Sequence, residues 1–174
     1  MVIAKTPQRD RANFLVFPPA LLLAIIVVSS LLQWVAPPGV LSQFDRTWRI
    51  FIGGGILLSG LVLTQAGART LLWNGTNVNP LKPTVALATD GIYRWSRNPM
   101  YVGGTPLMLG IAVVFGIDWL PLIMIPGGLL LHFGIVRREE RYLAAKFGDE
   151  YRRYCARVPR YLPGLAPGYH PQES

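Results

Sequence analysis

The sequence predicts an all-α integral membrane protein with about four transmembrane helices, followed by a C-terminal amphipathic cytoplasmic helix. Hydrophobic residues make up 51% of the 174 residues and charged residues only 15%, whereas a soluble domain carries roughly 25% charge. The apolar residues form four uncharged runs, each close to the roughly 20 residues that a helix needs to cross the hydrocarbon core. Because lipid cannot satisfy open backbone groups, these runs must be helical. The length indicates one domain over residues 1–174.

The first two runs predict two long helices within residues 1–72. The first run lies between Arg11 and Asp45 and predicts a helix over about Phe14 to Ala36, which ends at a Pro-Pro-Gly breaker. This run is too long for a cleaved signal peptide and has no convincing small-residue cleavage site. The second run predicts a helix over about Ile50 to Leu72, and its glycines allow close contact with a neighbouring helix in lipid.

The third and fourth runs predict a helical hairpin. Asn98 and Pro99 are typical of an N-cap followed by proline at the first helical position, so the third helix begins there and runs to about Gly116. Asp118 marks a tight turn, and the fourth helix runs from about Trp119 to Val136. Because both runs are short, these helices have little tilt or are partly covered by protein.

The pattern changes after Arg137. Leu143, Phe147, Tyr151 and Val158 recur at helical spacing, while most charged residues fall elsewhere on the helical wheel. This predicts one amphipathic helix that lies on the membrane or folds back over the core. Its end is marked by the prolines Pro159, Pro163 and Pro167.

The distribution of positive charge predicts the orientation in the membrane. The chain has 17 Lys and Arg residues, and only Arg46 and Arg49 lie in the loop between the first two helices. The other positive residues lie in three parts of the chain: before the first helix (Lys5, Arg9 and Arg11), in the loop before the third helix, and in the tail. The positive-inside rule places these three parts, and therefore both termini, in the cytoplasm. The net charge of +8 is then explained by topology and anionic lipid rather than by nucleic acid. With no cleavable signal, we expect a bacterial inner membrane.

The chain has few residues of the kinds that bind metals. A single cysteine, Cys155, excludes an internal disulfide and a cysteine-only metal site. With His132 and His170 as the two histidines, no plausible zinc constellation exists. We therefore expect no metal cofactor.

The first of two polar stretches, Asp90–Gly103, contains an arginine beside the start of the third helix. A helix N-terminus presents unpaired N–H groups and a partial positive charge. Beside Arg97, the start at Asn98 and Pro99 is therefore a candidate site for a carboxylate or phosphate. The alternative is an ordinary membrane-helix start, with an interfacial arginine, a cap and a tyrosine.

The second polar stretch, Arg137–Tyr151, contains two adjacent acidic residues directly after its first two arginines. Glu139 and Glu140 follow the fourth helix by about one turn, and His132 lies about two turns before Glu139 on the same face. A carboxylate there could hold an ammonium group or ribose hydroxyls, and His132 or Glu140 could act as a base. The alternatives are ion pairs with nearby arginines and, for His132, a hydrogen bond within the helix bundle.

The predicted hairpin allows the two polar stretches to meet on the cytoplasmic face. Together they offer an anion-binding helix end, a carboxylate, and aromatic surfaces from Tyr93, Trp95 and Tyr101. We expect a lipid-facing cavity beside them. This combination suits a zwitterionic aromatic cofactor and a lipophilic substrate.

Several short motifs follow one another over about Leu87 to Pro163. They are Gly91-x-Tyr93, Arg97-Asn98-Pro99-x-Tyr101, Glu139-Glu140-x-x-Leu143, Phe147-Gly148-x-Glu150-Tyr151, Tyr154 and Val158-Pro159 to Pro163. In this order and at this spacing, the region resembles the catalytic core of the isoprenylcysteine carboxyl methyltransferase family, to which the phospholipid N-methyltransferases are related. Each motif alone is weak, but together they are specific.

The resemblance implies an S-adenosylmethionine-dependent methyltransferase that acts on a lipophilic small molecule or a lipid. Residues 87–163 would be its cofactor-binding core, and in the family the helices and the C-terminal segment enclose the cofactor and leave a lateral opening for the substrate. Carried over residue by residue, the resemblance implies cofactor contacts at Leu87, Tyr93, Asn98, Pro99, Met100, Tyr101 and Glu139.

The sequence departs from the family at two positions. The eukaryotic enzymes have histidine where this chain has Asn98, which still donates and accepts hydrogen bonds. A substrate-contacting arginine of the carboxyl methyltransferases falls at Ile135, so Arg137 or Arg138 is the expected substitute for binding substrate. The sulfonium already activates the methyl group, so catalysis comes mostly from alignment in a dry site. Only an amine or alcohol acceptor needs a base.

Two other classes stay open from the sequence. A membrane NADPH-dependent reductase of sterol-like substrates has a similar C-terminal fold, although such reductases are much longer. A non-catalytic membrane scaffold would bind no cofactor and would tolerate the loss of Glu139 or Tyr101.

Overall fold

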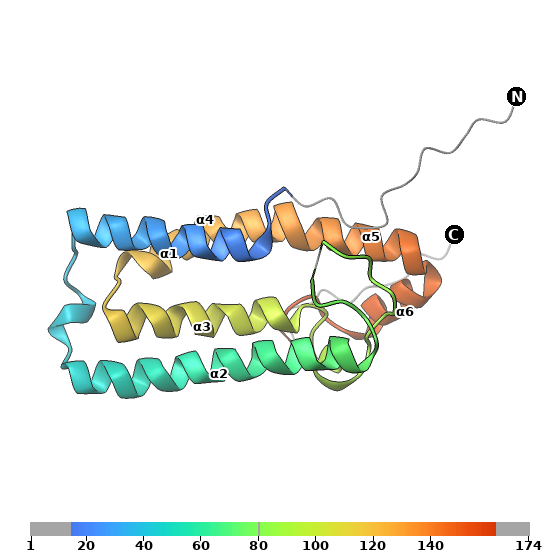
Figure 1. The fold of residues 1–174 in the computed structure, drawn as a ribbon, viewed down its shortest axis with the longest axis horizontal. Helices are drawn as coiled ribbons and strands as arrows, with labels where there is room; N and C mark the ends of the chain where they lie inside the picture. The colour runs from blue at the N-terminus through green and yellow to red at the C-terminus, as the bar shows by residue number, and fades with distance from the viewer. Residues whose placement is uncertain (1–14, 80, 163–174) are drawn as a thin grey trace, which may run out of the picture.

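The computed structural model describes residues 15–79 and 81–162, and within them every regular element is a helix. Four long helical segments lie along the long axis of the molecule, with further helices and a long loop at one end (Figure 1). Predicted features at Lys5, Arg9, Arg11, Phe14, Pro163, Pro167 and His170 lie outside the described residues. The elements are α1 (Pro18–Val35), η1 (Leu41–Gln43), α2 (Arg46–Trp73), η2 (Gly91–Arg94), α3 (Pro99–Phe115), α4 (Trp119–Leu131), η3 (His132–Val136), α5 (Arg137–Phe147) and α6 (Asp149–Arg157).

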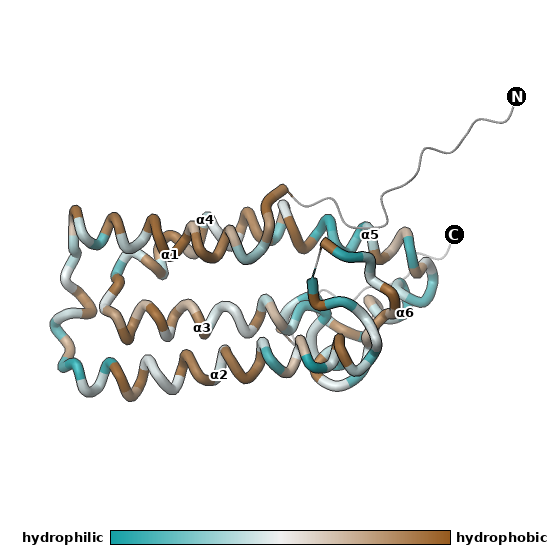
Figure 2. Tube along the Cα trace, viewed as in Figure 1, coloured by the Kyte–Doolittle hydropathy of each residue, from teal (hydrophilic) through white to brown (hydrophobic). Residues whose placement is uncertain are grey.

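Three of the described helices are long and apolar enough to cross a membrane, and a fourth is apolar but shorter. The three are α1, α2 and the continuous helix Trp119–Phe147, and the shorter one is α3, with 17 residues. Apolar residues cover the four long segments, whereas polar residues gather on α5 and α6 (Figure 2). The predicted all-α integral membrane architecture is confirmed at this level.

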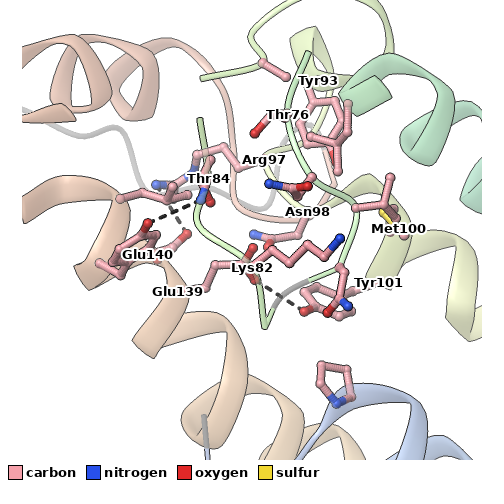
Figure 3. A pocket seen from close by; sticks show the side chains of 18 of the residues that line it. Thr76, Lys82, Thr84, Tyr93, Arg97, Asn98, Met100, Tyr101, Glu139 and Glu140 are labelled. Atoms are coloured by element: carbon pink, nitrogen blue, oxygen red, sulfur yellow. Dashed lines mark hydrogen bonds and ion pairs between the residues drawn. The ribbon is translucent and has the colours of Figure 1, made fainter. Parts of the chain in front are cut away.

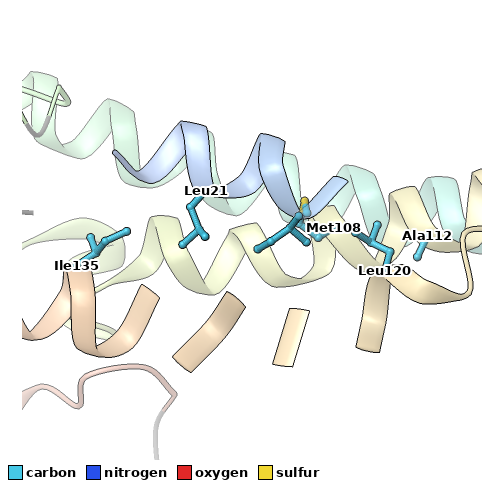
Figure 4. Close-up of a cluster of buried hydrophobic side chains, with 6 residues drawn as sticks. Leu21, Met108, Ala112, Leu120 and Ile135 are labelled. Carbon is cyan, nitrogen blue, oxygen red and sulfur yellow. The ribbon is translucent and has the colours of Figure 1, made fainter. Parts of the chain in front are cut away.

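A buried apolar cluster holds α1 against α3 and α4. Its members are all less than 9% exposed, and Ala112, Leu120 and Ile135 are fully buried. Figure 4 shows side chains from different helices converging along the bundle. The cluster contains Leu21, Ile25, Met108, Ala112, Leu120 and Ile135.

Glycines allow α2 and α3 to pack with their backbones in contact. A Cβ atom added at Gly60 would clash with the backbone nitrogen of Leu107 and would lie 2.6 Å from the carbonyl oxygen of Gly103. A Cβ atom added at Gly103 would in turn lie 2.7 Å from the backbone nitrogen of Thr64. Small residues give membrane helices this close approach, so the glycine-rich pattern predicted the contact correctly.

Adding one methyl group at this contact is expected to destabilise the fold. Because the neighbours of Gly60 are backbone atoms that cannot rotate away, Gly60→Ala should cost about 1–3 kcal/mol through overpacking. Gly55 is the matched control, since it is exposed and a Cβ atom there would meet nothing within 4 Å. Thermal unfolding in detergent should show a lower Tm for Gly60→Ala only. Equal Tm values for the two variants would contradict the close packing.

The two loops at one end of the bundle are joined through Asp118. Its carboxylate accepts hydrogen bonds from the backbone N–H groups of Gly39 (3.0 Å) and Leu41 (2.7 Å) and from the Gln33 side chain (3.2 Å). These bonds fix the end of α1 to the α3–α4 turn. The loop between α2 and α3, together with α5 and α6, lies at the opposite end (Figure 1).

The membrane helix that begins at Trp119 contains a π-helical segment, η3. Such a segment shifts the register of the residues that follow it relative to a regular α-helix. The carbonyl of Gly134 accepts a hydrogen bond from the N–H of Leu15 (3.2 Å), which fixes the chain just before α1. Ile135 and Val136 are fully buried, so this part of the helix faces protein.

The prediction of one continuous C-terminal amphipathic helix is wrong, because the structure has two helices there, α5 and α6. Gly148 separates α5 from α6 with φ +53° and ψ −124°, a conformation that is essentially restricted to glycine. The chain therefore reverses, and Tyr151, Tyr154 and Val158 pack as a second buried cluster with Leu143 and other residues of α5. The predicted apolar residues are therefore buried as expected, but those of α6 pack against those of α5 instead of continuing one helix face.

Candidate active site

A cavity of about 590 Å³ lies where the two polar stretches meet. This volume is within the roughly 300–1,000 Å³ that is usual for small-molecule sites. Its walls come from the beginning of α1, from α2, the α2–α3 loop, α3, α5 and α6, and Figure 3 shows its polar part. The prediction that both polar stretches share one end of the molecule is confirmed.

Glu139 and Tyr101 form a contact across the cavity. The hydroxyl of Tyr101, in the first turn of α3, donates a hydrogen bond to Glu139 Oε2 on α5 at 3.3 Å. The bond joins the third helix to the extension of the fourth. Since Tyr101 donates one proton, the other carboxylate oxygen can still accept from a ligand.

Glu140, the neighbouring carboxylate, is held by two arginines. Glu140 accepts from Arg160 at 2.8–3.1 Å and lies 3.3 Å from Arg97 Nη1. The side chains of Glu140 and Arg97 are only 12% and 13% exposed, whereas that of Arg160 is 37% exposed. Glu140 therefore ties the segment after α6 to α5 and to the loop before α3.

The same C-terminal segment is bonded to the residues that precede α3. The Arg160 carbonyl accepts from Ser96 Oγ (3.2 Å) and from Asn98 Nδ2 (3.1 Å), and the Pro159 carbonyl accepts from Arg97 N–H (2.9 Å). Asn98 precedes α3 as predicted, but its side chain makes no capping bond. Asn98 is thus the N-cap residue of α3, as predicted, but its amide holds the C-terminal segment instead of capping the helix.

The start of α3 has fewer free donors than the sequence suggested. Pro99 has no N–H, and the N–H groups of Tyr101 and Val102 both donate to the Asn98 carbonyl at 3.1 Å. A different donor lies beside them. Arg97 Nε is buried and has no hydrogen-bond partner among the described residues, so an acceptor from a ligand would satisfy it.

Two buried tyrosines connect α6 to the wall of the cavity. Tyr154 donates its hydroxyl hydrogen to the Tyr93 carbonyl at 2.8 Å. Burial raises the pKa of Tyr154, and burial together with the negative charge of Glu139 raises the pKa of Tyr93. Both phenols therefore stay protonated at neutral pH, and that of Tyr154 acts as a hydrogen-bond donor.

The long α2–α3 loop covers part of the cavity. Thr76, Lys82 and Thr84 are among its lining residues. Thr76 Oγ1 accepts from the N–H of Val85 at 3.0 Å, and the Thr84 N–H donates to the Tyr142 hydroxyl of α5 at 3.3 Å. This loop is thus folded onto the site, as expected for a loop too long to be a simple connection.

The structure brings most of the predicted site residues together. Pro99 is buried at the start of α3 but does not line the cavity, and Ile135 is fully buried elsewhere. The predicted residues that line the cavity are Leu87, Tyr93, Asn98, Met100, Tyr101, Glu139 and Glu140.

The other three predicted residues, His132, Arg137 and Arg138, do not line the cavity. His132 Nδ1 lies 2.8 Å from the Tyr161 hydroxyl, so the histidine contacts the C-terminal segment. Arg137 is exposed, and its guanidinium carbon lies 5.7 Å from the centre of the Phe133 ring. Sequence reasoning missed Arg160, Thr76 and Lys82, for which neither helical spacing nor a motif gave a signal.

Helices long and apolar enough to cross a membrane, with a partly apolar cavity at one end of them, define a helical membrane protein that has a cavity of small-molecule size. The comparison with known families makes this class specific. Residues 48–150, more than half of the chain, match the phospholipid methyltransferase family. The chain belongs to this family, and the predicted resemblance is confirmed.

Several relatives with curated names are also similar to this chain. Protein-S-isoprenylcysteine O-methyltransferase of Homo sapiens is 32% identical over 67% of this chain and 42% of its own length. Methanethiol S-methyltransferase of Mycobacterium tuberculosis is 27% identical over 90% of this chain and 65% of its own. The nickel-cobalt-cadmium resistance protein of Alcaligenes xylosoxydans xylosoxydans is 27% identical over 72% of this chain and 56% of its own. The chain thus spans less than two thirds of each of these relatives.

Within residues 15–79 and 81–162, no group of three or more His, Cys, Asp or Glu side chains is placed to hold a metal ion. The acidic side chains of the cavity, Glu139 and Glu140, are instead bonded to a phenol and to arginines.

Proposed function

We propose that this protein transfers a methyl group from S-adenosylmethionine to a lipophilic small molecule or lipid. The observation that carries the proposal is the cavity, which joins a polar end at Glu139, Arg97 and Asn98 to an apolar part between α1, α2 and α3. Membership of a methyltransferase family supports the reaction type. The names of the isoprenylcysteine and methanethiol relatives include both oxygen and sulfur as methyl acceptors.

The residues of the cavity fit S-adenosylmethionine chemically. The amino acid end of this cofactor carries an ammonium and a carboxylate group. Glu139 would hold the ammonium or the ribose hydroxyls, and the unpartnered Arg97 Nε would donate to the carboxylate. Aromatic and apolar side chains would contact the adenine, including Tyr93, Met100 and Leu87. When bound, the cofactor supplies a methyl group that its positive sulfonium has already activated.

The role of the chain in such a reaction is to orient the reactants and to exclude water. Tyr101 would fix the orientation of Glu139, and the pair Arg97–Glu140 would hold the walls of the site together. The loop bonded through Thr84 and Tyr142 would cover the cavity. Alignment of donor and acceptor in a dry site is sufficient for large rate enhancement in reactions of this kind.

We infer that the site faces the cytoplasm, with the bacterial inner membrane as the proposed location. The α2–α3 loop and the α5–α6 end carry most of the positive charge of the described residues, and the Asp118 end carries only Arg46 and Arg49. This distribution supports the orientation through the positive-inside rule. It also makes cytoplasmic cofactor directly available to the cavity.

The proposal predicts incorporation of label from methyl-tritiated S-adenosylmethionine into organic-soluble material. Membranes that contain the protein should transfer the label, and membranes with Glu139→Ala should transfer much less of it at the same cofactor concentration. Glu150→Ala is the control, since Glu150 is exposed on α6 and does not line the cavity. Labelling that is equal in all three membranes and in membranes without the protein would contradict the proposed function.

A further inference from the structure

One carboxylate at the cavity is shared unequally by two arginines. Arg160 binds Glu140 with two nitrogens, since its Nε lies 3.1 Å from Oε1 and 3.0 Å from Oε2, and its Nη2 lies 2.8 Å from Oε2. Arg97 reaches the same carboxylate with Nη1 alone, 3.3 Å from Oε1. A contact through two nitrogens is the stronger form of an arginine–carboxylate pair, so Glu140 is bound mainly by Arg160.

The two arginines lie on different sides of this carboxylate. Arg97 and Glu140 line the cavity, and Figure 3 shows their side chains joined on its wall, whereas Arg160 does not line it. The backbone carbonyl of Arg160 is held outside the cavity by Ser96 Oγ and Asn98 Nδ2. An effect of the Arg160 side chain on a ligand must therefore pass through Glu140.

The charges of this group leave one positive charge at the cavity. Within residues 15–79 and 81–162, Arg97 and Arg160 form ion pairs with no acidic side chain other than Glu140. Because Arg160 neutralises most of the charge of Glu140, the positive charge that remains is that of Arg97. Without Arg160, Glu140 would neutralise Arg97 instead.

The cofactor has a group that needs this charge. Its amino acid end carries a carboxylate and an ammonium group, and Glu139, bonded to Tyr101, is the proposed partner of the ammonium. The carboxylate then needs a cation, and Arg97 lines the cavity with an Nε that has no hydrogen-bond partner among the described residues. Lys82, the other basic residue of the lining, is exposed, so water weakens its attraction for an anion.

We propose that Arg160 is a positioning residue, which binds Glu140 from outside the cavity and thereby leaves the positive charge of Arg97 available to the cofactor carboxylate. The inference rests on the proposed use of S-adenosylmethionine. It gives the segment after α6 an electrostatic role in addition to its hydrogen bonds with the residues before α3.

Replacing Arg160 with glutamine is expected to weaken the binding of ligands that carry the carboxylate. S-adenosylhomocysteine keeps the amino acid end of the cofactor, whereas 5′-methylthioadenosine has the same adenosine and thioether without it. Calorimetry on the detergent-purified variant should show about tenfold weaker binding of S-adenosylhomocysteine, because Glu140 now neutralises Arg97. The affinity for 5′-methylthioadenosine should be unchanged, since the substitution keeps the backbone carbonyl at residue 160.

The matched control is Arg157→Gln. Arg157 is the last residue of α6, is exposed and does not line the cavity, so this variant should bind both ligands as the wild type does. Thermal unfolding of every variant, measured first, sets a titration temperature at which all of them are folded.

A double variant separates this electrostatic role from a purely structural one. In Arg160→Gln/Glu140→Gln, the carboxylate that competes for Arg97 is also removed, so the affinity for S-adenosylhomocysteine should return to within about threefold of the wild type. If Arg160 only held the fold together, the double variant would bind no better than the single one, because the contact between the two side chains is lost in both.

Three results would overturn the inference while leaving the proposed function intact. They are unchanged binding of S-adenosylhomocysteine in Arg160→Gln, an equal loss for both ligands in that variant, and a double variant that binds S-adenosylhomocysteine no better than Arg160→Gln. In each case the wild type still binds the cofactor product. Failure of the wild type to bind S-adenosylmethionine and S-adenosylhomocysteine would instead overturn the proposed function, and the inference with it.

Discussion

Replacing Glu139 with alanine is expected to weaken binding of S-adenosylmethionine roughly tenfold to a hundredfold. A hydrogen bond to a charged group contributes about 1.5–3 kcal/mol, and Glu139 is the carboxylate of the cavity that is not held by arginines. Tyr101→Phe should have a smaller effect, about threefold, because it removes only the hydroxyl that orients the carboxylate. Isothermal titration calorimetry on detergent-purified variants measures both.

The loss of affinity should be larger in Glu139→Ala than in Tyr101→Phe, and a control variant shows whether the loss is specific to the cavity. Glu150→Ala removes a carboxylate of α6 that is exposed and outside the cavity, and should leave the affinity unchanged. If Glu139→Ala binds the cofactor as tightly as Glu150→Ala does, then Glu139 is not the anchor. Circular dichroism before titration verifies that each variant has kept its helices.

Replacing Glu140 with alanine is expected to destabilise the protein by about 3 kcal/mol. Breaking a buried ion pair by removing one partner costs about 3–5 kcal/mol, and the lower end applies because Arg160 is 37% exposed. The variant leaves Arg97 without its carboxylate and frees the segment after α6 from α5. Thermal unfolding in detergent should therefore show a markedly lower Tm.

The matched control for Glu140 is an exposed ion pair on α6. Asp149 pairs with Arg152 at 2.9 Å, but their side chains are 76% and 67% exposed, so Asp149→Ala should cost less than about 1 kcal/mol. A large loss of turnover in Glu140→Ala with an unchanged Tm would contradict this structural role. It would return Glu140 to the role of a base that the sequence suggested.

The membrane helices could be predicted from the sequence because their signal is local. Uncharged runs of sufficient length gave α1, α2 and the hairpin of α3 and α4, with the start of α3 at Pro99 as expected. The break between α5 and α6 was missed, since the apolar spacing continues across Gly148. The signal was present in that glycine, because glycine commonly ends a helix.

Only those site residues that belong to a sequence motif could be predicted correctly. Glu139, Tyr101 and Asn98 belong to motifs, and they line the cavity. His132 was placed by counting two regular turns back from Glu139, but the π-helical η3 lies between them and changes the register. The contact of Arg160 with Glu140 depends on the reversal at Gly148, and the position of Lys82 depends on a loop without periodicity.

The most direct test of the proposed function is binding of S-adenosylmethionine to the detergent-purified wild-type protein, measured by calorimetry beside NADPH. The cavity and its charges predict saturable, one-to-one binding of S-adenosylmethionine in the micromolar range and no binding of NADPH. Absence of binding, or a preference for NADPH, would contradict the assignment of the cavity as a methyl-donor site and would favour a membrane reductase or a scaffold.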